Sequence, residues 1–414
     1  MDLRRLAVVT LAAATLGGLY ACVQSSSSLP PPTGNSSSDA SGNSAASGVT
    51  GSTSSGMGFD KQAMLVDAAA QIESTYAEAI AAAEALETAT AAWDESDDEV
   101  DRLAAQDAWR EAMAAWQRAE LMQVGPAGVM GVVAGGQDLR DEIYSWPLYN
   151  RCRVDQEIVQ QDYLDPPTLA GETINVRGLD ALEHLLFETG TDNACAPQND
   201  INASGSWDQV ADLDSRRAAY AHVVATLAKQ SLQALVSRWA DGFASELSSA
   251  GAGSSTYASQ RDALNALSDA MFYLHDKTKD AKLAVPAGLL DCVQATCPQA
   301  LEHIPAQFSK AAVAANIEGF ERVYTGGEDR LGFDDWLDAL GQEQLNQDML
   351  AAIEGVKAAL AGVEEDDFLA ALESDPESVV AVHTALKAVT DLLKSDFVTV
   401  LDLDLPQSAE GDND

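Results

Sequence analysis

Residues 60–93 read DKQAMLVDAAAQIESTYAEAIAAAEALETATAAW, and this stretch points to the fold class. Alanine, leucine and glutamate dominate it, and these residues have high intrinsic helix propensities. The stretch lacks the alternation of apolar and polar residues that a half-buried strand requires. We therefore predict one long helix that starts near Asp60.

The segments that follow continue the helical pattern. Residues 96–124 predict a second helix, with Ser96 as its N-cap, acids in its first turn and Gly125-Pro126 as its terminator. A less regular section runs to about residue 170, and a short helix follows whose predicted end is Gly190. Further helices are predicted at 207–250, 255–283, 298–324, 341–361 and 375–395.

Two successive all-helical bundles are the economical architecture for this all-α chain. The sequence GAGSS at 251–255 interrupts the helical pattern. We therefore predict an N-terminal bundle at 58–251 and a C-terminal bundle at 252–402, followed by an acidic tail at 403–414.

The N-terminus resembles a bacterial lipoprotein signal. Arg4 and Arg5 precede an apolar run that is short and interrupted by glycine, which is typical of an export signal rather than of a membrane span. The run ends in LYAC, which is similar to a lipobox, so residues 1–21 are predicted to be a signal peptide and Cys22 to be lipidated. The alternative is an ordinary signal peptide that ends beside a structural cysteine.

The lipobox also implies a location. Residue 23 is Val rather than Asp, which favours the outer membrane, on its periplasmic side or at the cell surface. Residues 22–57 are rich in Ser, Gly and Pro and have almost no large apolar side chains, so they predict a disordered, flexible linker. The membrane is thus an expected partner through the lipid anchor.

The charge balance excludes one class of partner. The chain has 24 Lys and Arg against 65 Asp and Glu, a formal charge of −41. Such a surface repels phosphate backbones, so nucleic-acid binding is not expected. It suits solubility in salt or attraction of cations.

The cysteines predict two disulfides. Lipidation of Cys22 would leave four, an even number in an exported protein. Cys292 and Cys297 can close a small loop, and Cys152 then pairs with Cys195. A zinc site built from cysteines is the rival, but the chain has no CxxC.

The segment RGLDALEHLLF, residues 177–187, resembles the signature of the imelysin family. Other landmarks occur in the order that family shows: AWQRAELMQVGP, IYSWPLYN, DAKLAVPAGL and SKAAVAANIEGFERVYTG. The resemblance runs from about residue 60 to 400. It implies an exported bacterial protein of two helical bundles, of a kind described both as insulin-cleaving metallopeptidases and as proteins of iron regulation or uptake.

One departure from the family affects the peptidase prediction. The family motif is Gly-x-His-x-x-Glu; here Gly178 and Glu183 match it, but Asp180 holds the place of the histidine. His184 lies beside the motif, not in it. Since the peptidase activity depends on that histidine as a metal ligand, the altered motif disfavours it.

The signature segment is amphipathic when placed on a helix. Its leucines gather on one side, and Asp180, Glu183, His184 and Glu188 lie on the other. A solvated polar face is the simplest interpretation. Phe187 is poorly placed on a solvated face, however, so we expect neighbouring structure to cover that side and make it a site.

The chemistry of such a site would favour hard cations. Asp in place of an imidazole shifts preference towards oxygen-liking cations such as iron or another divalent ion, and away from zinc. The chain has five histidines and no HExxH. General acid/base catalysis by the two carboxylates ranks low, because nothing else indicates a sugar cleft.

Several other residues are candidates for the same region. The spacing of Trp109 and Trp116 is typical of core positions, and Trp146-Pro147 predicts a packed turn. The resemblance implies that Arg118, in the segment WQRAE with Glu120, balances Asp180 and Glu183. It also implies that three residues of the second bundle face the signature: Lys282, Ser309 and Asn316. The tetrapeptide ALEH occurs at 181–184 and 300–303, which is weak evidence for duplication.

The sequence therefore predicts a binding protein with a cation or small-ligand site at the interface of the bundles. Metal (iron) acquisition with outer-membrane or periplasmic uptake components is what the resemblance implies. The first alternative is a metallopeptidase that uses Glu183 and His184, which requires His275 or His303 to lie near His184. The second is a surface scaffold without a site.

Overall fold

The computed structural model describes residues 58–409, and all regular elements in that range are helical, with no strand. This confirms the predicted all-α class. The predicted signal peptide, Cys22, the linker and residues 410–414 lie outside the described residues. None of the helices in the described range has both the length and the apolar character that a membrane span needs.

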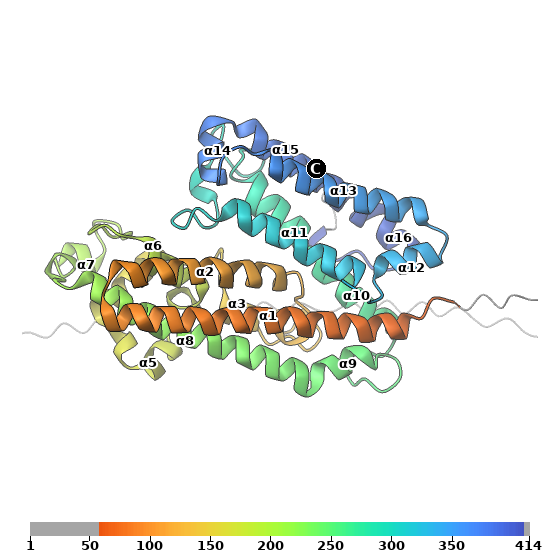
Figure 1. Ribbon diagram of the computed structural model, residues 1–414, viewed down its shortest axis with the longest axis horizontal. Helices are drawn as coiled ribbons and strands as arrows, with labels where there is room; N and C mark the ends of the chain where they lie inside the picture. Colours follow the sequence, from red (N-terminus) through yellow and green to blue (C-terminus); the bar gives the residue numbers. More distant parts are fainter. Residues whose placement is uncertain (1–57, 410–414) are drawn as a thin grey trace, which may run out of the picture. The chain divides into compact units, whose positions relative to one another are not determined.

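Three long helices form the first part of the described chain. Helix α1 (Lys61–Ser96) begins where the Asp60 carboxylate accepts a hydrogen bond from the Ala63 amide, as predicted. Helices α2 (Glu99–Ala119) and α8 (Leu213–Arg238) lie along α1 (Figure 1). A π-helical turn, η5 (Trp239–Phe243), joins α8 to α9 (Ala244–Ser248).

The predicted start of α2 is wrong by two residues. Ser96 is the last residue of α1, and the chain turns at Asp97, which has a left-handed backbone with φ of 52°. Asp98 caps α2, and its carboxylate accepts a hydrogen bond from the Val100 amide. Because three acidic residues follow Ser96 in succession, the sequence alone does not identify which residue caps α2.

Short helices connect α2 to α8. They are α3 (Leu139–Ile143), α4 (Arg151–Gln160), α5 (Pro166–Gly171), α6 (Leu179–Phe187) and α7 (Asp200–Ala203). Helix α6 is the predicted signature helix, but it ends at Phe187 because the backbone is extended at Glu188, so Gly190 does not cap it. The predicted Cys152–Cys195 disulfide is confirmed and ties α4 to the segment after α6.

The second helical set begins after residue 255. It contains α10 (Gln260–Met271), the π-helical segment η6 (Leu274–Ala284), α11 (Ser309–Thr325), α12 (Phe333–Ala339), α13 (Glu343–Gly362), α14 (Phe368–Ser374), α15 (Pro376–Leu392) and α16 (Val398–Val400). The second predicted disulfide, Cys292–Cys297, is also confirmed. The predicted helix at 298–324 is wrong in its first part: residues 302–307 form turns, in which His303 and Gln307 have positive φ.

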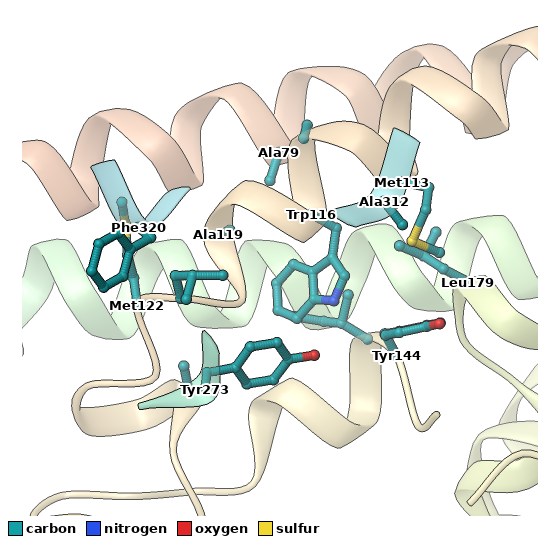
Figure 2. Close-up of a cluster of buried hydrophobic side chains, with 14 of the residues drawn as sticks. Ala79, Met113, Trp116, Ala119, Met122, Tyr144, Leu179, Tyr273, Ala312 and Phe320 are labelled. Atoms are coloured by element: carbon teal, nitrogen blue, oxygen red, sulfur yellow. The ribbon is translucent and has the colours of Figure 1, made fainter. Parts of the chain in front are cut away.

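The two helical sets share buried contacts. The described residues, 58–409, belong to one compact unit, and the predicted boundary at residue 252 stays a prediction. Figure 2 shows Trp116 of α2 among residues of helices that are distant in sequence, including Ala79 of α1 and Phe320 of α11. Helix α11 approaches α2 so closely at Gly319 that an added Cβ would lie 2.3 Å from the Arg118 carbonyl oxygen.

This close approach generates a stability prediction. Gly319→Ala should lower the free energy of unfolding by about 1–3 kcal/mol, because backbone atoms would have to move apart. Gly355→Ala is the matched control: Gly355 is exposed on α13 with no atom within 4 Å of the added Cβ. That change should stabilise the protein by about 0.5–1 kcal/mol. Urea unfolding measures both, and an unchanged midpoint for Gly319→Ala would contradict the packing described.

Candidate functional site

Gly178 sets the start of the signature helix. Its φ is 93°, a conformation that residues with a Cβ rarely adopt. An added Cβ would also lie 2.9 Å from the Ile143 carbonyl oxygen and 3.0 Å from Asp180 Oδ1. The motif glycine therefore allows α6 to pack against the end of α3.

Asp180 is almost fully buried at the start of α6. Only 2% of the surface of Asp180 is exposed. Oδ2 accepts hydrogen bonds from the Ser145 amide (3.1 Å) and from the Ser145 hydroxyl (2.5 Å). Burial raises the pKa of Asp180 to about 6, although these hydrogen bonds act to lower it.

Glu183 lies one helical turn further on and contacts the second helical set. Its Oε2 is 2.8 Å from His303 Nδ1, and its Oε1 accepts a hydrogen bond from the Ala306 amide at 3.1 Å. Glu183 is 5% exposed. Burial acts to lower the pKa of His303, but the carboxylates of Glu302 and Glu183 raise it above its usual value.

His303 is connected to a buried polar network. On its Nε2 side it lies 3.3 Å from the Tyr144 hydroxyl, which donates to Glu302 Oε1 at 2.6 Å. Glu302 Oε2 in turn forms an ion pair with the Lys282 ammonium at 3.0 Å. Burial acts to raise the pKa of Glu302, but Lys282 and His303 lower it below its usual value.

Lys282 is the centre of this network. Its ammonium donates to Gln117 Oε1 (2.6 Å) and to Asn316 Oδ1 (3.0 Å) and lies 3.7 Å from Glu120 Oε2. Glu120 also binds Arg140, at 2.9 Å. Lys282 and Asn316 thus contact α2, and neither lines the pocket beside the signature helix.

A pocket of about 170 Å³ opens beside the two signature carboxylates. Asp180, Glu183 and His303 line it. The other lining residues come from the segment after α3 and from the turns before α11: Tyr144, Trp146, Pro147, Tyr149, Arg151, Gln299, Ala300, Leu301, Ile304 and Pro305. The acidic side of α6 is therefore covered rather than solvated.

Two predicted site residues lie elsewhere. His184 Nε2 contacts Asp155 Oδ1 of α4 at 2.8 Å, and does not line the pocket. Arg118 pairs with Glu78 (3.6 Å) and Glu318 (3.4 Å), not with Asp180 or Glu183 as expected. Both residues project from their helices in directions that the local periodicity could not resolve.

The three tryptophans singled out in the sequence pack in different parts of the structure. Trp116 is buried in the core, and Trp109 donates from its ring nitrogen to the Leu179 carbonyl at 2.7 Å. The Trp109 ring also covers Phe187, with ring centroids 5.3 Å apart, which explains the aromatic residue on the polar side of α6. Trp146 lies in a packed turn, as predicted, and lines the pocket.

Sequence reasoning missed the partners that complete the site. Ser145 and Tyr144 lie in the recognised segment IYSWPLYN, but nothing in their pattern identified them as ligands of acids. Glu302 and His303 belong to the second ALEH, a repeat that is by itself only weak evidence of duplication. That repeat was the available signal: Glu183 of the first copy binds His303 of the second.

Asp180 and Glu183 do not form a preformed metal-binding site at the signature helix. All four oxygens of Asp180 and Glu183 already accept a hydrogen bond or an ion pair. Within residues 58–409, the group of three whose ligand atoms lie within 4.8 Å of one another is elsewhere, at His275, Asp276 and Asp280. Lys279 Nζ lies 2.6 Å from Asp280 Oδ1, so that group already contains a cation.

Fold and site together define an all-α protein in which an open pocket, lined by two buried carboxylates, lies between segments that are distant in sequence. The chain belongs to the imelysin family (peptidase M75), whose pattern it matches over residues 72–395. No curated protein matches the sequence.

Two solved structures share the fold. An imelysin-like protein from Psychrobacter arcticum 273-4 has 18% sequence identity and a TM-score of 0.64, and the match covers 84% of this chain and 96% of that one. A putative iron-regulated protein A precursor from Parabacteroides distasonis ATCC 8503 has 17% identity and a TM-score of 0.61, with coverage of 83% and 97%.

The burial of Asp180 generates a pH prediction. The folded state holds the Asp180 proton more tightly than the unfolded chain does, because the pKa rises from 3.8 to about 6 on folding. This contribution to stability, on the order of 3 kcal/mol, is present below about pH 4 and is lost as the pH rises to 6. The Asp180→Asn variant lacks this contribution, because an amide does not titrate in this pH range.

The difference in free energy of unfolding between wild type and Asp180→Asn should therefore change by that amount between pH 4 and 7, in favour of the variant at the higher pH. Urea titrations at several pH values measure it. Glu84→Gln, on the exposed side of α1, controls for loss of a negative charge. A difference that stays constant with pH would mean that Asp180 is not buried as described.

Proposed function

We propose that this protein is a binding protein whose pocket at Asp180 and Glu183 takes a small cationic ligand. The observation that carries the proposal is the burial of two carboxylates in the wall of one pocket. Carboxylates removed from water gain most from a positive partner, because water no longer screens them. The formal charge of −41 would also draw cations towards the surface.

The same geometry weighs against the peptidase alternative. That alternative needs His184 and a second histidine as metal ligands near Glu183. His184 is directed to Asp155, and His303 lies against Glu183 itself. Glu183 would have to leave both His303 and the Ala306 amide before it could activate water.

We further propose where the protein acts. The lipobox at Cys22 supports attachment to the outer membrane, and a lipid-anchored binding protein would present its pocket to periplasmic or surface partners. A place in metal (iron) acquisition is supported by family membership and by the name of the Parabacteroides structure.

Isothermal titration tests the binding function. The purified body should bind a cation from a panel of Fe³⁺, Mn²⁺, Ca²⁺, Zn²⁺ and simple ammonium ions with one-to-one stoichiometry. Asp180→Ala should abolish that binding, because the pocket loses a buried charge. Asp334→Asn is the control, since burial also raises the pKa of Asp334 to about 6 but Asp334 does not line the pocket.

Two results would overturn the proposal. One is the absence of Asp180-dependent binding across the whole panel, which would favour a scaffold. The other is chelator-sensitive proteolysis that disappears in Glu183→Ala, which would favour the metallopeptidase.

A further inference from the structure

We infer that the ligand of this pocket is an organic cation, a protonated primary amine on a short apolar chain, rather than a bare metal ion. The inference rests on the proposed function, because it specifies the cation that the same pocket takes. Three features of the pocket carry it: the state of its carboxylates, one unsatisfied hydroxyl and the character of its walls.

The carboxylates suit a hydrogen-bond donor better than a metal. Asp180 Oδ2 accepts two hydrogen bonds from Ser145, whereas Asp180 Oδ1 and both oxygens of Glu183 have one partner each. A carboxylate oxygen can accept a second hydrogen bond without losing the first. A calcium ion, in contrast, collects six to eight oxygens at about 2.3–2.6 Å, and magnesium requires a near-ideal octahedron. The pocket would have to be rebuilt to supply either.

The Tyr149 hydroxyl is the unsatisfied group. It is buried and has no hydrogen-bond partner among the described residues. Burial raises the pKa of Tyr149 well above its usual value, and the charges of Glu183 and Asp180 raise it further, so the phenol is neutral and close to both acids. Leaving such a group unpaired away from water is destabilising. An ammonium donates three hydrogen bonds, enough for Asp180, Glu183 and the Tyr149 oxygen together.

The walls suit the carbon chain of such a ligand. Trp146, Pro147, Leu301, Ile304 and Pro305 supply the apolar part of a lining that is otherwise mostly polar. The volume of about 170 Å³ far exceeds the roughly 15 Å³ that one water requires, so the pocket has room for several heavy atoms beyond the charged nitrogen. Ammonium groups are also stabilised beside aromatic rings.

The cations already present do not neutralise the pocket. His303 is shared between Glu183 and Glu302, and Lys282 is held by Glu302 and by α2. Arg151 also lines the pocket, and its guanidinium lies 3.9 Å from Glu188. Asp180 is the carboxylate whose partners are all uncharged: Ser145 and its own helix. It is therefore the group that an incoming ammonium would pair with.

Isothermal titration with matched probes tests the inference on the folded wild-type protein. We expect n-butylammonium to bind with one-to-one stoichiometry and n-butanol, its neutral analogue of similar shape, to show no binding. Tetramethylammonium should bind at least tenfold more weakly than n-butylammonium, because it has no N–H to donate. Mn²⁺, Ca²⁺ and Fe³⁺ should give no Asp180-dependent binding.

Two variants locate the binding. Tyr149→Phe should weaken n-butylammonium about tenfold, since one hydrogen bond to a charged group is lost. Asp180→Asn should weaken it about a hundredfold. Tyr257→Phe is the control, because Tyr257 also has a buried hydroxyl without a hydrogen-bond partner but does not line the pocket. It should leave the affinity unchanged.

The outcomes separate this inference from the proposed function. Asp180-dependent binding of a metal ion without binding of n-butylammonium would overturn the inference and leave the cation-binding function standing. Equal binding of n-butylammonium and n-butanol would overturn the inference, because charge would not be recognised. Absence of binding by every probe, in protein with wild-type circular dichroism, would overturn both.

Discussion

A buried lysine between two buried glutamates is the constraint on which the arrangement of this protein depends. Lys282, from η6, is 2% exposed and lies 3.0 Å from Glu302 and 3.7 Å from Glu120. Removing one charge from such a group would leave the others unpaired in a medium that solvates them poorly, which is strongly destabilising. The partners come from α2, from the turns before α11 and from α11 itself, so the network holds distant segments in one relative position.

The same network positions the residues that line the pocket beside the signature helix. Glu302 is held by Lys282 and Tyr144, and its neighbour His303 adopts a positive φ that directs its ring between Glu302 and Glu183. Histidine tolerates this conformation better than β-branched residues do. Residues of the turns at 302–307 and of the signature helix thus line the pocket together. The polar network is both the tie between the helical sets and the support of the site.

The helical elements followed from local signals, and their errors have local causes. Helix α1 and its start near Asp60 follow from the alanine-rich sequence, because helix propensity needs no tertiary context. The start of α2 was placed at Ser96, since any of three following acids could serve as the cap. The helix at 298–324 was begun too early, because buried pairing at Glu302 and His303 overrides the helix propensity of that segment.

The sequence by itself determined the all-α class, both disulfide pairs and the acidic side of the signature helix, because these depend on propensity, spacing and periodicity along one segment. Only the tertiary structure decided which acid meets which cation. Periodicity placed His184 and Arg118 beside Asp180 and Glu183, but the fold directs them to Asp155, Glu78 and Glu318 and brings in His303 from 120 residues away. The physical reason is that a buried charge pairs with a group that the tertiary packing brings within about 4 Å of it. The separation of two residues along the chain does not indicate whether packing will bring them together.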